Sequence, residues 1–248
     1  MTDAYPIPDF LRQQPAERQA KERPIIFSAP MVRSLLAGSK SQTRRALNQQ
    51  PIENGQIGGF AFVDGFWCAL SGFDGSIINR LDRPCHYGQP GDRLYVRENA
   101  WERPERTPAM MRDGADTWPP FIYDADYTNG IPREERDDLK TWGWKRRPSI
   151  HLPRWASRIL LEIVEVRVER LQDISEADAI AEGITTIWPD GPRPDKGPNH
   201  YTIMIDSVSY NAPTAREAYA QLWEMINGEG SWDANPFVWT ISFRRIAP

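Results

Sequence analysis

A ten-residue stretch of the chain joins the end of a helix to a basic run. Residues Leu36 to Arg45 read Leu-Ala-Gly-Ser-Lys-Ser-Gln-Thr-Arg-Arg. Upstream, Ser28 is a favourable helix N-cap, Pro30 is tolerated in a first turn, and Gly38 is a typical terminator. Residues from Lys40 onward should therefore emerge just beyond a helix end. We expect this helix to bury an apolar face formed by Met31, Leu35 and Leu36.

Three strands are indicated by alternation of apolar and polar residues. After the turn at 89–91, residues Asp92 to Glu98 alternate and predict a half-buried strand. The longest signal runs from Arg158 to Glu169, and its apolar phase shifts near Ile163, which predicts a β-bulge there. Residues Phe237 to Ile246 alternate again. A short buried strand is expected at Ile25 to Phe27.

Two more helices have clear start and stop signals. Ser175 begins a short helix that ends at Gly183, with Glu182 in its last turn. Thr214 and Glu217 form a capping box for a longer helix that ends at Gly228. The apolar face expected for the short helix is Ala177, Ile180 and Ala181, and for the long one it is Ala215, Ala218, Tyr219, Leu222, Trp223 and Ile226.

Strands separated by irregular segments, with about three helices, favour an α+β barrel over a doubly wound parallel sheet. No glycine-rich loop follows a strand, so nucleotide-triphosphate chemistry has no support. The length of 248 residues fits one domain. We expect a flexible N-terminal arm at 1–22 and one domain at 23–248, with insertions near 49–88, 102–148 and 185–213.

The composition bears on disulfides, metal sites, membrane association and overall charge. The two cysteines, Cys68 and Cys85, have no CxxC or Cys/His spacing, which predicts neither a disulfide framework nor a zinc site. The three histidines are far apart, so no metal is expected. No apolar run is long enough to span a bilayer and no signal-peptide core is present, so we expect a cytoplasmic protein with no membrane partner. The net charge of −4 argues against a general nucleic-acid coat.

The stretch from Leu36 to Arg45 resembles the signature of the ASCH family, in which a helix ends in Gly and is followed by Lys, two residues, Thr and a nearby Arg. Further segments match in the same order, over about half the chain: 91–98, 171–184 and 235–239. The runs Pro-Arg-Trp-Ala-Ser-Arg at 153–158 and Asn-Pro-Phe-Val-Trp at 235–239 are similar to ASCH proteins of phages and prophages. The resemblance implies a PUA-like β-barrel with a few flanking helices and long insertions.

The resemblance also implies a chemistry. Small bacterial ASCH enzymes of similar pattern hydrolyse N(4)-acetylcytidine with a Lys, a Thr three residues later and a Glu, which would be Lys40, Thr43 and Glu182 here. A desolvated lysine can serve as the base that a threonine nucleophile needs. A carboxylate in the last turn of a helix opposes the helix dipole, so Glu182 should seek a cation, and Lys40 is the candidate. Alternatively, Lys40 and Glu182 form a purely structural ion pair and Thr43 is a strand residue.

Candidate binding residues are cationic or aromatic. Between Lys140 and Leu161 the chain has six Lys or Arg, three Trp and no acid, which suits phosphate contact and base stacking but equally a solvated basic face. The expected substrate or nucleic-acid ligands are Arg44, Arg45, Arg97, Trp155 and Arg158. Alternative roles are a solvated strand edge for Arg44 and Arg45, a partnership between Arg97 and Glu98, and core packing for Trp155.

Three functions are consistent with this pattern. The first is an amidohydrolase that removes the acetyl group from N(4)-acetylcytidine or a related modified nucleoside, without a metal or other cofactor. The second is a non-catalytic module that binds RNA or a modified base, through a basic groove joining Arg44 and Arg45 to the 140–158 run. A ribonuclease is the third, weaker possibility. The size of the chain departs from the enzymes it resembles, because their length of about 100 residues leaves no room for the three insertions.

Overall fold

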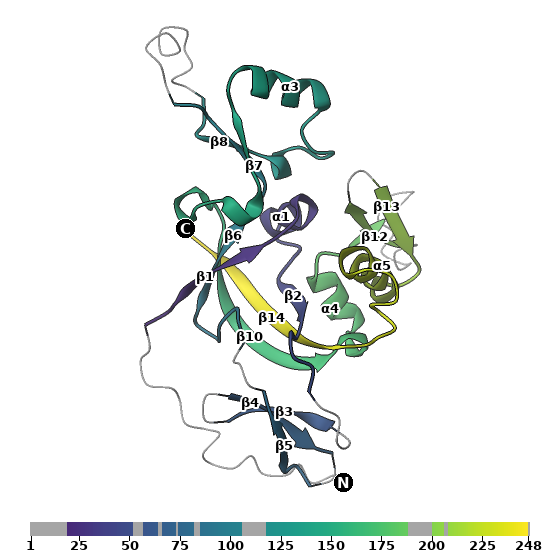
Figure 1. Ribbon diagram of the computed structural model, residues 1–248. Coiled ribbons are helices and arrows are strands. Elements are labelled where there is room, and N and C mark those ends of the chain that lie inside the picture. Colours follow the sequence, from purple (N-terminus) through teal and green to yellow (C-terminus); the bar gives the residue numbers. More distant parts are fainter. Residues whose placement is uncertain are drawn as a thin grey trace.

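The computed structural model describes residues 19–51, 57–63, 66–72, 74–81, 85–105, 118–187, 200–205 and 208–247. Its framework is a five-stranded sheet in the order β1-β6-β10-β14-β2 (Figure 1). β1 and β6 run parallel, and the other neighbours run antiparallel. The ladders run from β1 at one edge to β2 at the other, and among the described strands no ladder joins these two edges. The strands are, in sheet order, Glu22–Ile26, Arg93–Arg97, Leu160–Arg170, Phe237–Ile246 and Gln42–Ala46.

The strands predicted from alternation are confirmed. Leu94 and Val96 of β6 are buried while Arg93 on the alternate face is exposed. In β10, the pairing with β14 shifts register between Ile163 and Glu165. This irregularity is the predicted bulge, and it lets apolar residues on both sides of Ile163 reach the core.

Three helices pack around the sheet: α1 (Ala29–Leu36), α4 (Glu176–Ala181) and α5 (Ala215–Asn227). Their starts and stops agree with the predicted caps, but each predicted apolar face includes an exposed residue, and for α4 a second one, Ala177, is exposed as well. Leu36, Ile180 and Ile226 are exposed, with 38%, 41% and 52% of their surfaces accessible. All three lie in the last turns of their helices, beyond the part that the sheet or a neighbouring helix covers. Val32 and Ala179 are buried instead.

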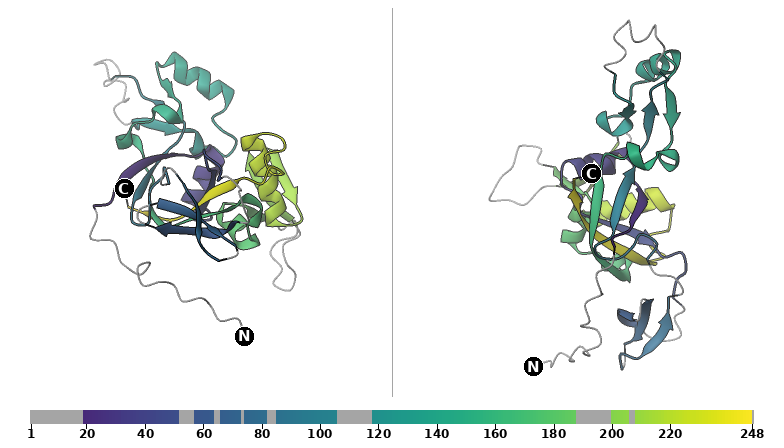
Figure 2. Two further views of the ribbon diagram at one scale, coloured as in Figure 1. Left: turned by 60° about the horizontal axis from the view of Figure 1, so that its bottom comes forward. Right: turned by 90° about the vertical axis from the view of Figure 1, so that its left-hand side faces the viewer.

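Each of the three irregular segments contains a three-stranded sheet of its own. In Figures 1 and 2, the first and second of these sheets lie at opposite ends of the molecule, and the third lies beside α5. The first consists of β3 (Ile57–Val63), β4 (Phe66–Ser71) and β5 (Ile77–Arg80). The second consists of β7 (Ala100–Glu102), β8 (Phe121–Tyr123) and β9 (Lys145–Arg147), with α3 (Arg133–Thr141) packed beside it. The third consists of β11 (Thr185–Ile187), β12 (His200–Ile205) and β13 (Val208–Ala212).

Short 3-10 turns connect several elements: η3 (Asp124–Asp126), η4 (Ser149–His151), η5 (Arg154–Ala156) and η6 (Leu171–Asp173). Residues 1–18 of the predicted N-terminal arm lie outside the described residues, and β1 begins at Glu22, the last residue of that arm. Within the described part of the chain, no helix has the length and apolar character needed to cross a membrane.

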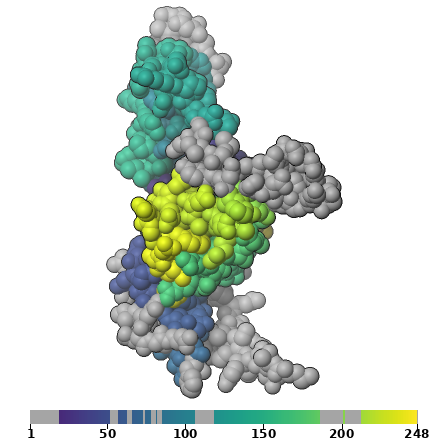
Figure 3. Space-filling view, turned by 90° about the vertical axis from the view of Figure 1, so that its right-hand side faces the viewer, coloured from purple at the N-terminus to yellow at the C-terminus, as the bar shows by residue number. Residues whose placement is uncertain are grey.

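The two faces of β14 contribute side chains to two different hydrophobic cores. Trp239, Ile241 and Phe243 belong to the main core, which also contains residues of β1, α1, β6 and β10. Val238 faces the other way and packs with residues of α4 and α5 in a second core. We call the three small sheets satellite sheets. Figure 3 shows the yellow-green α5 region between the teal and the blue satellite sheets. The second core contributes Tyr219 and Trp223 to the wall of the candidate site.

Candidate functional site

The candidate site forms where the ends of α1 and α4 meet. Gly38 and Gly183, which follow these helices, have φ values of +77° and +102°, a region that favours glycine. At Gly183 a Cβ atom would lie 3.2 Å from the Cβ of Ser34, so only glycine permits this close approach without displacing Ser34. The amide of Ser41 donates to the carbonyl of Ala181 at 2.8 Å. The two glycines therefore bring Lys40 next to Glu182.

Lys40 and Glu182 form a buried ion pair, as the helix-dipole argument predicted. Lys40 Nζ lies 2.9 Å from Glu182 Oε2, and it also donates to the carbonyls of Glu182 at 2.7 Å and Gln42 at 2.8 Å. Both residues are only 3% exposed. An ammonium has three protons, so these three acceptors satisfy it completely. The Lys40 ammonium also lies over the ring of Phe27, 5.5 Å from its centroid.

Arg44 extends this pair into a charged network. Its guanidinium is fully buried and lies 3.4 Å from Glu182 Oε1, 2.8 Å from Glu169 Oε1 and 3.3 Å from Asp178 Oδ2. The carboxamide of Gln42 accepts a further bond at 2.9 Å. Buried charges are stable only when paired, and here each buried cation has at least one carboxylate partner. Glu182 is the shared carboxylate of both cations.

Burial and neighbouring charges have opposing effects on the pKa values of Lys40 and Asp178 in this network. Burial lowers the pKa of Lys40 below its ordinary value of 10.5, although Glu182 acts to raise it. Burial acts to raise the pKa of Asp178, but Arg44 and neighbouring hydrogen bonds outweigh it, so the pKa lies below 3.8. The lysine is therefore easier to deprotonate than a solvated one, which is a property of a general base.

A small cavity of about 50 Å³ runs along the edge strand β2. Thr43, Arg44, Arg45 and Ala46 form one wall, and Glu182 also lines the cavity. The opposite wall comes from Met31 of α1 and from α5, through Tyr219, Leu222, Trp223, Ile226 and Asn227. Lys40 does not line the cavity in the described residues and contacts Glu182, which does. The structure thus brings Thr43 and Glu182 to one cavity, with Lys40 attached to Glu182.

Donor groups surround this cavity. The Nε atoms of Arg44 and Arg45 are buried, and among the described residues neither has a hydrogen-bond partner. Buried donors without acceptors cost about 1–3 kcal/mol each, so they are unusual and often mark functional positions. They are suitable for stabilising negative charge on a carbonyl oxygen.

Tyr219 is a member of the site that sequence reasoning did not identify. It was placed on the apolar face of the last helix, and it is indeed buried, but it also lines the cavity. Burial, reinforced by the charge of Glu182, raises its pKa well above 10, so the phenol stays protonated. A sequence signal was present, because Tyr219 carries the only hydroxyl among the six residues of the predicted helix face.

The remaining predicted ligands lie in different places. Arg45 is half-buried, lines the cavity and donates to the carbonyl of Ile26 at 2.8 Å. Arg97 donates to the carbonyl of Ile150 at 3.0 Å and does not pair with Glu98 among the described contacts. Trp155 is 68% exposed and packs against Phe121, so the core-packing alternative is wrong. None of Arg97, Trp155 and Arg158 lines the β2 cavity.

Arg158 is held by carboxylates instead. It forms a bidentate ion pair with Glu98, at 2.9 and 3.0 Å, and contacts Asp126 at 2.6 Å. Its guanidinium also stacks over Tyr123, 4.0 Å from the ring centroid. Glu98 is only 1% exposed, so Arg158 neutralises a buried charge. These contacts occupy the groups that were expected to bind phosphate.

The basic run at 140–161 is largely neutralised by acids that come from elsewhere in the sequence. Most of its cations pair with a carboxylate: Lys140 with Asp137, Arg146 with Asp124, Arg147 with Glu102, Arg154 with Glu22, and Arg158 with Glu98 and Asp126. Arg44 is buried within its own network. The expected groove from Arg44 along this run is therefore not assembled from these residues.

Among the described residues, no group of three or more His, Cys, Asp and Glu side chains is arranged to hold a metal ion. Comparisons with protein-family models, curated proteins and solved structures found no match to this chain.

Proposed function

We propose that this chain is a PUA-like protein of the ASCH type and that its β2 cavity is the site of an amidohydrolase. The substrate class is N(4)-acetylcytidine or a related acylated nucleoside. One observation carries the proposal: Thr43 and Glu182 line one cavity, and Lys40 contacts Glu182, although Glu182 lies 142 residues from Lys40 in the chain. Hydroxyl, carboxylate and amine are the three groups that metal-free acyl transfer from an amide needs.

In the proposed reaction, the hydroxyl oxygen of Thr43 attacks the acetyl carbonyl and its proton passes to the neutral amine of Lys40. For this transfer, Lys40 exchanges one of its three present hydrogen bonds for one with Thr43. Glu182 positions the amine through its carboxylate and its carbonyl. The negative charge on the acetyl oxygen is stabilised by the positive charges of Arg44 and Arg45, which line the cavity. The cytosine amine then leaves with a proton from Lys40, and water releases acetate from Thr43.

Pocket size determines how the substrate enters. A volume of about 50 Å³ accommodates an acetyl-sized group, whereas ligand pockets typically measure about 300–1,000 Å³. The nucleoside must therefore remain outside the cavity or displace the end of α5. Ile226, near the C-terminal end of α5, both lines the cavity and is 52% exposed, so this wall of the cavity lies at the protein surface.

The test is release of cytidine and acetate from N(4)-acetylcytidine by the purified protein. Thr43→Val removes the hydroxyl with little change of shape and should reduce kcat/KM by about 100-fold or more, whereas Thr43→Ser keeps the hydroxyl and should retain activity. The pH profile should rise on the alkaline side as Lys40 loses its proton. An inactive, folded wild-type protein would exclude this activity.

A second candidate function, binding of RNA or a modified base without chemistry, is favoured by the hydrogen bonding of Lys40. Its three protons are fully satisfied and it does not line the cavity among the described residues, as expected for a structural role. This function predicts saturable binding of cytidine or an RNA strand with no turnover. Loss of that binding in Arg45→Gln, together with inert wild-type protein in the hydrolysis assay, would favour it over the enzyme.

A further inference from the structure

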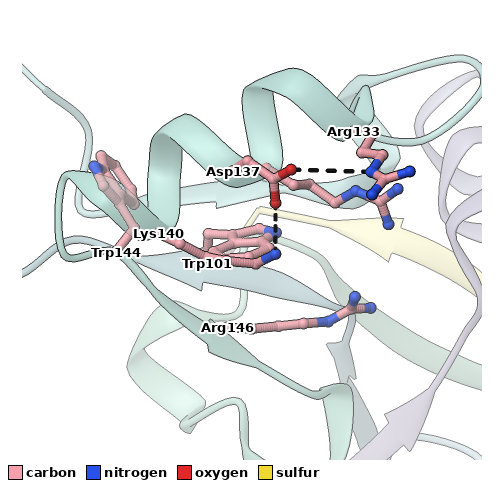
Figure 4. Close-up of a pocket in the computed structure, with 7 residues that line it drawn as sticks. Trp101, Arg133, Asp137, Lys140, Trp144 and Arg146 are labelled. Atoms are coloured by element: carbon pink, nitrogen blue, oxygen red, sulfur yellow. Dashed lines mark hydrogen bonds and ion pairs between the residues drawn. The ribbon is translucent and has the colours of Figure 1, made fainter.

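A second pocket lies on the satellite sheet β7-β8-β9, beneath α3. It has a volume of about 480 Å³ and shares no lining residue with the β2 cavity. Figure 4 shows labelled side chains from α3, β7 and β9 converging on it. Its volume is within the range of pockets that hold a nucleotide-sized group.

The pocket is strongly cationic. Arg133, Arg136 and Lys140 of α3 line it together with Arg146 of β9, and Asp137 is the only carboxylate among the described residues of the lining. Residues at these α3 positions are spaced by three or four, so they share one face of the helix. The acids Glu134, Glu135 and Asp138 of the same helix are not part of the lining.

Two carboxylates act on these four cations among the described residues. Asp137 lies 2.7 Å from Lys140 Nζ and 4.0 Å from Arg133 Nε (Figure 4). Both of these pairs are exposed, so they are weak and readily exchanged for another anion. Asp124 is half-buried, lies 3.4 Å from Arg146 outside the pocket lining, and also attracts Arg136. Two carboxylates therefore do not saturate four cations.

The aromatic residues of the pocket offer hydrogen-bond donors. Trp101 and Trp144 line it and are only 3% and 4% exposed. Their indole nitrogens are buried, and neither has a hydrogen-bond partner within the described residues. A buried N–H group without an acceptor is unusual in a folded protein.

A stacking surface adjoins the pocket. Trp142 directly follows α3, two residues after Lys140, and is 51% exposed. Its ring centroid lies 5.7 Å from that of Trp118, which lies 6.0 Å from that of Trp144. This row of three indoles leads from the pocket to an exposed ring. An aromatic ring beside cations is the arrangement that binds an unpaired base and its phosphate.

We propose that the α3 pocket binds the phosphate groups of a single-stranded nucleic acid, with a base stacked on Trp142. The cations take the phosphate oxygens, with Asp137 displaced from Lys140. A strand is favoured over a duplex because stacking on Trp142 requires a base that is not paired. The proposal does not rest on the hydrolytic activity, since the two sites are built from different residues.

The experiment measures fluorescence anisotropy of a labelled 12-residue oligouridylate with the full-length protein. Binding should weaken with salt, with a log–log slope of about −2 to −3 for three or four phosphate contacts on a single strand. Arg136→Gln combined with Lys140→Gln should weaken binding by about 10-fold or more at low salt. Trp142→Ala should weaken it by about 10-fold with a nearly unchanged salt slope, because it removes stacking rather than charge.

Matched controls separate this site from general electrostatics and from the proposed enzyme. Arg244 is exposed and paired with Glu162 on the main sheet, so Arg244→Gln changes one charge away from the pocket and should leave binding unchanged. Thr43→Val, which removes the proposed nucleophile, should also bind normally. Each variant except Thr43→Val alters exposed side chains, so its melting temperature should match that of the wild type, whereas Thr43 is buried.

Several outcomes would overturn the proposal. Wild-type protein without affinity for the strand at low salt, or an Arg136→Gln/Lys140→Gln variant that binds like the wild type, would exclude the pocket. Equal weakening by Arg244→Gln would show attraction by overall charge only. Uridine monophosphate should compete only at concentrations at least about 100-fold above those of the oligomer, because it offers one phosphate. Equal competition would identify a free nucleotide as the ligand and contradict the strand.

Discussion

Lys40 donates to Glu182 twice, to its side-chain carboxylate at 2.9 Å and to its backbone carbonyl at 2.7 Å. A single lysine thus neutralises the carboxylate of Glu182 and binds a carbonyl at the C-terminal end of α4. This helix has no basic residue in its last turn. The ammonium stabilises the negative end of the helix dipole where a solvated side chain would be screened. The pair joins two chain segments that share no strand ladder, because Glu182 lies at the C-cap of α4 and Lys40 before β2.

Removing the charge of Glu182 should be more damaging than removing that of Lys40. Glu182→Gln leaves Lys40 and one side of Arg44 without a buried counter-ion, with an expected loss of about 3–5 kcal/mol in the free energy of unfolding. Lys40→Met should cost less, because Arg44 still lies 3.4 Å from Glu182. Urea denaturation measures both values. The control is Lys140→Met, which removes an exposed pair at 2.7 Å and should change stability by no more than about 1 kcal/mol. Similar losses for buried and exposed pairs would contradict the prediction.

The helix caps provide a second contrast. Thr214 Oγ1 accepts a bond from the amide of Glu217 at 3.1 Å, so Thr214→Ala should destabilise the protein by about 1 kcal/mol. Ser28 occupies the same position before α1, but its side chain makes no cap hydrogen bond. Ser28→Ala should therefore have almost no effect. Thermal denaturation of the two variants side by side would show this difference, and an equal loss for both would contradict it.

Stability should fall at alkaline pH through Cys85. Burial raises the pKa of this thiol from 9.0 to about 11. The unfolded chain therefore loses the thiol proton at a lower pH than the folded protein, so deprotonation favours unfolding. The contribution is fully present below pH 9.0 and is lost as the pH rises to about 11. Urea denaturation across this range should show a smaller decline for Cys85→Ala than for the wild type. Equal slopes would mean that Cys85 contributes nothing to the decline.

Arg158 should prove structural rather than a phosphate ligand. Arg158→Met leaves the buried Glu98 without its two-pronged partner, with an expected cost of about 3–5 kcal/mol near neutral pH. Burial raises the pKa of Glu98 above 4.5 even with Arg158 present, and removal of Arg158 raises it further. The deficit should therefore shrink as the pH falls, because a neutral carboxyl needs no cation. Combining Arg158→Met with Glu98→Gln should recover part of the loss at neutral pH. A deficit that is independent of pH would contradict this account.

Local signals in the sequence located three of the five strands of the main sheet, β6, β10 and β14. The strand expected at 25–27 is β1 at Glu22–Ile26, and β2 at Gln42–Ala46 had no alternation signal. Alternation located β6 and β14, and the phase shift near Ile163 located the bulge in β10. The helix-dipole argument identified Lys40 as the partner of Glu182. In each case the signal is a property of a few neighbouring residues, or of one charge in a defined helical position.

Other features depend on distant parts of the chain and had no local signal. The burial of Arg44 requires Glu169 and Asp178, which approach it only after β10, α4 and β2 have assembled. The pairing of the basic run with Glu22, Glu102 and Asp124 is likewise set by the tertiary fold. Alternation within the satellite sheets is short or interrupted by glycine, so these strands were not resolved from the sequence.

The position of β14 has a consequence for how the protein is made. This strand lies inside the sheet, between β10 and β2, yet it is the last strand of the described chain. A ribosome releases both neighbours long before it releases Ile246. Until then, the nascent chain presents two strand edges that lack their partner, which is the condition under which chains associate wrongly. A chain truncated before Phe237 would leave both edges unpaired, so the main sheet is completed only after β14 has been synthesised.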